Sequence, residues 1–231
     1  MKNYLLILLS TLCLATAFSQ EEEVVTEVDS LYKEDQFYGG ATYNLLLNSP
    51  KGISQSGFSS GFHIGFIKDM PINTKRDLAI GLGIGLSSNS FNQNMLIDTA
   101  DDKNYSYTAL DNNDISYSKN KFTTYMVEAP LEFRWRTSTA TEYKFWRIYT
   151  GIKLGYVFAN SSKFIGESDI KHSNIADFNK MQYGLTLSVG YNTWNIHVYY
   201  GLNPIFNSDA KLDAASIDMR AVKIGLMFYI L

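Results

Sequence analysis

The chain contains almost no cysteine. Its 231 residues include one cysteine, Cys13, which lies inside an N-terminal apolar stretch that follows Lys2. This stretch is typical of a secretory signal peptide over residues 1–19, with cleavage near Gln20. The mature protein is therefore expected to contain no disulfide and no cysteine metal ligand.

Long apolar runs are missing after the signal peptide, and proline is scarce. No later stretch approaches the roughly 18 apolar residues of a membrane-spanning helix. There are 4 Pro, but 14 Phe, 16 Tyr and 16 Gly, and the mean hydropathy is only -0.13. A high content of aromatic residues and glycine at modest hydropathy fits strands that face lipid on one side and a barrel lumen on the other.

Neither sign of charge dominates beyond residue 35. Residues 1–35 contain two of the 20 basic and seven of the 23 acidic residues, which leaves 18 and 16. This near-neutral remainder gives no reason to expect a nucleic-acid partner. We interpret residues 20–35 as an acidic periplasmic leader that is solvated; docking in the periplasm through its few apolar residues is the alternative.

Apolar residues alternate with a period of two from Gln36 to the C-terminus, which predicts β-strands. In the third strand, aliphatic residues occupy one face and Ala, Gly and Ser the other, as a narrow barrel requires. We therefore predict an all-β fold, an eight-stranded antiparallel up-and-down transmembrane β-barrel over residues 36–231. The expected strands are roughly 36–46, 57–68, 77–88, 122–136, 145–158, 180–191, 194–203 and 221–231.

The connections between these strands alternate in length. Long extracellular loops and short periplasmic turns are typical of outer-membrane barrels, so we predict an outer-membrane location. Trp135, Trp146 and Trp194 lie beside short turns, which predicts an aromatic belt at the periplasmic interface. The long segments are 47–56, 89–121, 159–179 and 204–218, and the turns are 69–76, 137–144 and 192–193.

The last strand resembles the C-terminal assembly signal of bacterial outer-membrane barrels. Lys223, Gly225, Phe228 and Ile230 occupy the polar, glycine, aromatic and hydrophobic positions of that signal. The resemblance implies that the barrel assembly machinery is a partner and that outer-membrane lipid surrounds the folded chain.

The fourth strand carries a resemblance to a family. Its run Tyr125-Met-Val-Glu128-Ala-Pro130-Leu131 resembles the Tyr-x-x-Glu-x-Pro-Leu run of PorT-like, porin-family small outer-membrane barrels, found in bacteria with a type IX secretion system. Segments 151–156 and 183–191 are similar to later strands of that family. The resemblance implies an outer-membrane barrel. Some members belong to secretion or gliding machinery, which makes envelope or secretion-complex proteins candidate partners.

Strand parity places several charged residues in the predicted lumen. Unpaired charges in a narrow barrel are costly, so we expect salt bridges, with Lys153, Arg147 and Lys223 as the nearest cations to Glu128. Paired carboxylates for acid–base catalysis are the alternative, but an eight-stranded lumen offers no substrate cleft. The predicted inward charges are Glu128, Glu132, Arg134, Arg136, Arg147, Lys153, Lys180 and Lys223.

The remaining candidates favour structural roles. His63 and His197 point inward, and we expect packed neutral imidazoles rather than a metal pair. His172 lies in a loop and is expected to be solvated. Loop 89–121 lacks the spacing of a calcium site, which favours a flexible acidic loop. Its acids are Asp98, Asp101, Asp102, Asp111 and Asp114.

Three functions fit this pattern. The first is a non-enzymatic barrel with a filled lumen, without metal or cofactor, that acts on partner proteins through its loops or periplasmic rim. The second is a passive pore for small solutes, which an eight-stranded lumen disfavours. The third is a barrel-borne enzyme, for which no Ser/His/Asp arrangement stands out.

Overall fold

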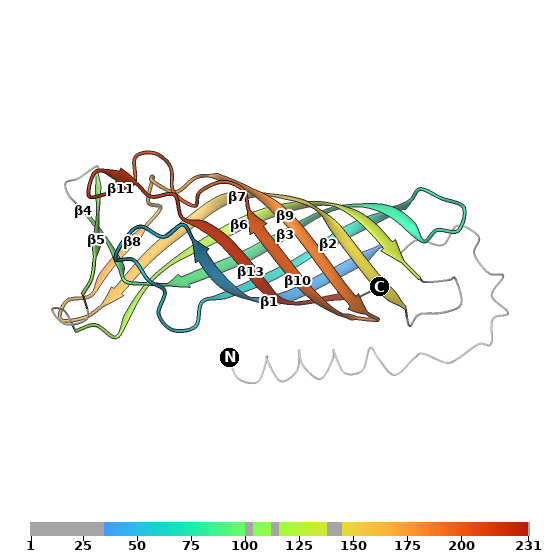
Figure 1. Cartoon of the computed structure of the whole chain (residues 1–231), viewed down its shortest axis with the longest axis horizontal. Coiled ribbons are helices and arrows are strands. Elements are labelled where there is room, and N and C mark those ends of the chain that lie inside the picture. Colours follow the sequence, from blue (N-terminus) through green and yellow to red (C-terminus); the bar gives the residue numbers. More distant parts are fainter. Residues whose placement is uncertain (1–34, 100–103, 112–115, 138–144, 231) are drawn as a thin grey trace, which may run out of the picture. The chain divides into compact units, whose positions relative to one another are not determined.

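Eight long strands close into an antiparallel barrel in the computed structural model, which describes residues 35–99, 104–111, 116–137 and 145–230 (Figure 1). The ring order is β6-β3-β2-β1-β13-β10-β9-β7, and β6 also pairs with β7, so every strand has two neighbours. The predicted fold class is therefore confirmed. The strands are β1 (Gln36–Leu47), β2 (Ser60–Pro71), β3 (Leu78–Asn92), β6 (Lys119–Arg136), β7 (Trp146–Ile165), β9 (Met181–Tyr191), β10 (Trp194–Gly201) and β13 (Arg220–Ile230).

Several sequence predictions lie outside the described residues. These are the signal peptide over 1–19, the acidic leader apart from Asp35, Asp101, Asp102 and Asp114 of the long acidic loop, nearly all of the turn 137–144, and the terminal residue of the last strand. No helix in the described ranges is long and apolar enough to cross a membrane.

The two faces of β3 show why these residues form a barrel wall. Leu82 is 54% exposed on the outer face, whereas Ala79 is fully buried on the inner face. The inner glycines are needed for space: a Cβ at Gly85 would collide with the hydroxyl of Tyr38. A large side chain from β1, two strands away in the ring, thus fills the lumen where β3 carries none.

Strand β2 differs from its predicted bounds by three residues at each end. Gly57 has a φ of 68°, in the left-handed region that an extended strand does not use. Phe58 therefore precedes β2 and is 72% exposed. The later end, at Pro71 instead of residue 68, brings Asp69 from the predicted turn onto the lumen face of the strand.

Short strands fold the long connections at one end of the barrel (Figure 1, left). Strands β4 (Met95–Thr99) and β5 (Tyr105–Ala109) form a hairpin inside the segment 89–121. Strand β8 (Ile170–Ser173) extends the sheet beside β7, and β11 (Lys211–Leu212) pairs with β12 (Ala215–Ser216). The prediction of a flexible acidic loop is wrong for this hairpin.

Candidate functional site

Glu128 is the centre of a buried polar network in the lumen. It lies on β6 with 1% of its surface exposed. Its carboxylate accepts a hydrogen bond from Ser87 Oγ at 2.7 Å, and its Oε2 lies 3.2 Å from Lys153 Nζ and 3.3 Å from His63 Nδ1. These partners come from β3, β7 and β2, so one carboxylate ties together four consecutive strands of the ring from the lumen side.

A second network lies toward the short-turn end. Arg134 donates through Nε to Glu132 at 3.1 Å, through Nη1 to Asp69 at 3.0 Å and through Nη2 to Gln36 Oε1 at 2.8 Å. Arg136 Nη1 binds the other oxygen of Asp69 at 2.8 Å. Asp69 therefore bridges two fully buried guanidinium groups, and its carboxylate compensates charge that would otherwise be costly to bury.

Aromatic rings surround two of the buried cations. The Arg134 guanidinium carbon lies 4.4 Å from the ring centroid of Tyr149, and Lys223 Nζ lies 4.7 Å from that of Tyr199. Such contacts stabilise a cation more strongly when water is excluded. Lys223 is buried on the lumen side of β13, the side that the two-residue alternation predicts for it.

Two predicted lumen charges lie away from Glu128. Arg147 is buried at the short-turn end, with its guanidinium carbon 4.4 Å from the Phe145 ring. Glu128 pairs with Gly155, eight residues further along β7 than Arg147, which corresponds to about 26 Å of strand. Lys180 is exposed just before β9 begins, so its predicted inward orientation is wrong.

The two lumen histidines have protein partners. His63 contacts Thr42 and Glu128, and His197 Nδ1 lies 2.7 Å from Ser188 Oγ. Within the described ranges, no group of three His, Cys, Asp or Glu side chains could hold a metal ion. Both imidazoles thus form part of the lumen packing.

Little free space remains at the level of these networks. A cavity of about 10 Å³ lies beside Glu132, Lys153 and His197, which is about the space of one water molecule. A substrate has no room beside the lumen carboxylates, and their partners are other protein groups. This arrangement can bind the walls to one another and fill the pore.

A hydrophobic core closes the long-loop end of the barrel. We call it the cap core; all four long connections contribute to it, together with upper residues of the barrel strands. Phe122 is its hub, with ring centroids 5.0 Å from Phe91, 5.5 Å from Phe178 and 5.4 Å from Phe206. Its buried members are Ile53, Phe91, Met95, Ile97, Tyr107, Phe122, Ile175, Phe178, Tyr199, Ile205, Phe206, Ala210, Leu212, Ile217, Met219 and Ala221.

Polar contacts join the loops above this core. Tyr107 of β5 donates a hydrogen bond to Asp177 at 2.8 Å, and burial together with this carboxylate raises the pKa of the Tyr107 hydroxyl above its ordinary value. His172 Nε2 lies 3.2 Å from Asp98 Oδ1, and its ring meets the edge of Tyr105. The prediction that His172 is solvated is therefore wrong, because β4, β5 and β8 meet around it.

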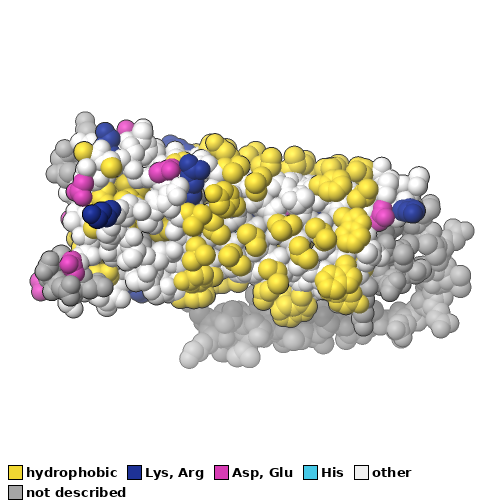
Figure 2. All heavy atoms as spheres, viewed as in Figure 1, with side chains coloured by type: hydrophobic (Ala, Val, Ile, Leu, Met, Phe, Trp, Pro, Cys, Tyr) yellow, Lys and Arg dark blue, Asp and Glu magenta, His cyan; other side chains and the backbone are white. Residues whose placement is uncertain are grey.

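The outer surface carries the residues predicted for membrane contact. On the face shown in Figure 2, hydrophobic side chains cover the stretch toward the short-turn end, and charged side chains lie at its borders and beyond. Trp135, Trp146 and Trp194 are exposed near the short-turn ends of their strands. Of the assembly-signal residues, Phe228 packs against Trp194 with ring centroids 4.7 Å apart, and Ile230 is exposed.

Gly225 of that signal lies on β13 opposite Thr42 of β1. A Cβ at this position would collide with the carbonyl oxygen of Ala41. Packing against β1 therefore favours a glycine at this position of the closing strand. Recognition of the signal by the assembly machinery stays a prediction.

The family model of the outer membrane protein beta-barrel domain matches residues 18–207. The chain belongs to this family. It is thus an outer-membrane β-barrel protein, with lipid around its apolar surface, and the long-loop end is the extracellular end by the general rule for such barrels. No curated protein matches the chain.

Two solved structures of outer-membrane barrels are similar to the chain. Ail, the attachment invasion locus protein of Yersinia pestis, is 13% identical, with 87% of this chain and 100% of that chain covered and a TM-score of 0.35. A mutant of the Rhodopseudomonas blastica porin is 8% identical over 86% of this chain and 100% of that chain, with a TM-score of 0.22. The fold assignment itself rests on the closed ring of strand pairs.

Sequence reasoning missed two parts of this site. The sequence predicts Asp69 in a turn because the expected second strand ends three residues before β2 does. The sequence predicts loops for most of the cap core, although Met95 and Ile97 already show the alternation of a strand. Their burial depends on residues more than 100 positions away, such as Phe206 and Met219.

Proposed function

We propose that this protein is a non-enzymatic, non-conducting outer-membrane barrel that acts as a structural or interaction component of the envelope. The observation that carries the proposal is the filled pore. Ion pairs around Glu128 and Asp69 fill the lumen, and the cap core lies above them. Such an interior stabilises a barrel and leaves its outer surfaces for function.

A passive solute pore is the weaker candidate. Transport of even a small sugar needs a continuous aqueous path, whereas the cavity beside Glu132 and Lys153 measures about 10 Å³. An enzyme is weaker still, because the buried carboxylates are bound to cations and enclosed. The filled lumen supports neither activity.

The surface we assign to partners is the ordered extracellular end. Short strands β4, β5, β8, β11 and β12 fix its loops over the cap core, so exposed residues such as Lys51 and Asp213 are presented on a defined framework. Binding to a preformed surface costs less conformational entropy than binding to flexible loops. We infer that the partners are envelope proteins, and the resemblance to PorT-like barrels makes type IX secretion or gliding machinery the first system to test.

Site-specific photo-crosslinking in cells tests this function. A photoreactive amino acid at Lys51 or Asp213 should give a discrete protein adduct, whereas the same probe at Thr74, exposed in the turn between β2 and β3, serves as the control for the opposite rim. If only the probe at Thr74 forms adducts, the partner binds at the periplasmic rim instead of the extracellular end. No adduct from any position, combined with solute uptake by vesicles that contain the protein, would contradict the proposal.

The secretion role needs a separate measurement. Deletion of the gene in a bacterium with a type IX secretion system should lower the amount of secreted cargo or abolish gliding, and the wild-type gene should restore it. Normal secretion and gliding in the deletion strain would remove this part of the proposal and leave the interaction role.

A further inference from the structure

Lysines form a row across three strands at the extracellular end of the barrel. Lys121 of β6 lies directly opposite Lys163 of β7, and Lys163 lies directly opposite Lys171 of β8. Lys119 follows on the same face of β6, two residues from Lys121. Like charges placed directly opposite one another destabilise a sheet, so strand pairing does not account for the row.

These lysines face outward and lack protein counter-charges. On β6, the residues between them, such as Asn120 and Phe122, are buried, whereas Lys119 is exposed and Lys121 partly exposed. In the described part of the chain, none of the four forms an ion pair, although Glu167 and Asp169 lie in the nearby β7–β8 turn. Their ammonium groups are therefore available to an external anion.

The row lies just above the lipid-facing surface. The rings of Tyr125 and Phe158, with centroids 6.5 Å apart, mark the upper end of the apolar face on β6 and β7. Lys121 lies four residues beyond Tyr125, which corresponds to about 13 Å along the strand. Because barrel strands are tilted, the separation along the membrane normal is shorter. A lysine stem can extend along the apolar surface toward the headgroup level.

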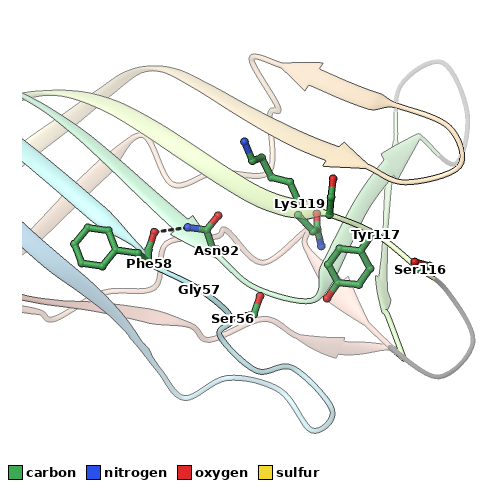
Figure 3. Close-up of a pocket in the computed structure, with 9 residues that line it drawn as sticks. Ser56, Gly57, Phe58, Asn92, Ser116, Tyr117 and Lys119 are labelled. Atoms are coloured by element: carbon green, nitrogen blue, oxygen red, sulfur yellow. Dashed lines mark hydrogen bonds between the residues drawn. The ribbon is translucent and has the colours of Figure 1, made fainter.

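A polar hollow adjoins the row on its β3 side (Figure 3). It has a volume of about 490 Å³ and is lined by Ser56, Asn92, Ser116, Tyr117 and Lys119 among others. Asn92 is the cross-strand partner of Lys121, so the hollow and the lysine row form one continuous surface. Hydroxyl and amide groups beside an aromatic ring suit a sugar better than a lipid tail.

We propose that this surface binds the phosphorylated sugar headgroup of a glycolipid in the outer leaflet. The ammonium groups of Lys119, Lys121, Lys163 and Lys171 contact the phosphates, and the hollow receives a sugar ring. The site rests on the family's outer-membrane location and not on the proposed interaction role. It anchors the extracellular rim to lipid on one side of the barrel.

The test uses purified, folded protein in zwitterionic detergent and bisphosphorylated lipid A as the probe. Replacement of Lys121, Lys163 and Lys171 by Gln should weaken binding about 100-fold, at about fivefold for each lysine near a charged lipid surface. The control replaces Lys68, Lys75 and Lys211 by Gln, which changes the net charge equally at exposed positions elsewhere, and should leave binding unchanged. Faster gel migration before boiling than after it shows that each variant is folded.

Further probes separate the sources of the anion. Dephosphorylated lipid A should bind weakly to the wild type. Its affinity should not exceed that of bisphosphorylated lipid A for the variant in which Lys121, Lys163 and Lys171 are replaced by Gln. Ser56→Trp, which fills the hollow, should weaken binding of lipid A and leave binding of phosphatidic acid, which has no sugar, unchanged. Equal losses in the lysine variant and its control, full binding of the dephosphorylated lipid, or saturable binding of inorganic phosphate without binding of lipid A would each overturn the proposal.

Discussion

Removal of the Glu128 carboxylate tests the lumen network most sharply. Glu128→Ala leaves Lys153 buried without the oxygen that lies 3.2 Å from its Nζ, and it removes the acceptor of Ser87 Oγ. Breaking a buried ion pair by deleting one partner typically costs about 3–5 kcal/mol. With only 5% of Lys153 exposed, relief by water is limited, so we expect a loss in this range.

The assay is urea unfolding of the protein in lipid vesicles, followed by tryptophan fluorescence. Lys153→Met alone should also be destabilising, because it removes the ammonium group that lies 3.2 Å from the buried Glu128 carboxylate. The double variant Glu128→Ala with Lys153→Met should recover part of the loss, because the buried Lys153 charge that Glu128→Ala leaves unpaired is then absent. Glu167→Ala, at an exposed carboxylate in the β7–β8 turn, is the control and should change stability by less than about 0.5 kcal/mol.

Additivity would refute this reasoning. If the free-energy losses of Glu128→Ala and Lys153→Met simply sum in the double variant, the two side chains do not interact in the folded barrel. A large loss in the Glu167 control would show that the assay reports net charge and not the buried pair.

Three further predictions follow from the walls and the cap core. Leu82→Arg should cost about 2–4 kcal/mol on the lipid face, whereas Thr74→Arg in the short turn should be neutral in the same urea assay; equal effects would mean that the outward face is misassigned. Gly151→Ala should cost about 1–3 kcal/mol, because its Cβ would collide with the Leu131 carbonyl oxygen. Gly39→Ala should be neutral, because a Cβ added there meets open space. A larger loss of stability in Gly39→Ala than in Gly151→Ala would contradict the packing. Phe122→Ala should cost about 3–5 kcal/mol and expose the extracellular loops to protease, and unchanged cleavage would show that the cap core does not order them.

The barrel wall could be predicted from sequence because its pattern is local. In a strand whose faces meet lipid and lumen, alternate residues meet the same environment, so the alternation predicts that Leu82 faces outward and Glu128 inward without knowledge of neighbouring strands. Glycine positions were harder to interpret. Gly83 faces inward, but a Cβ there would lie 2.5 Å from the Phe66 carbonyl oxygen, so close packing and not lumen polarity explains it.

The candidate site was only partly predictable because its contacts are long-range. Glu128 and Lys153 lie on adjacent strands, and parity alone brings them to the same side of the wall. The Asp69–Arg134 pair depends on where β2 ends, and a three-residue error in that boundary hid it. The cap core depends on which loops meet over the barrel, and that choice is made by packing between segments far apart in the chain.

Single-channel recording in planar bilayers tests the filled lumen most directly. The wild-type barrel should insert without stepwise conductance, because ion pairs around Glu128 and Asp69 and the cap core of Phe122 and its neighbours leave no continuous aqueous path. A general porin in the same bilayers confirms that open channels are detected. Regular conductance steps from the wild-type protein, at a level proportional to the salt concentration, would contradict the account.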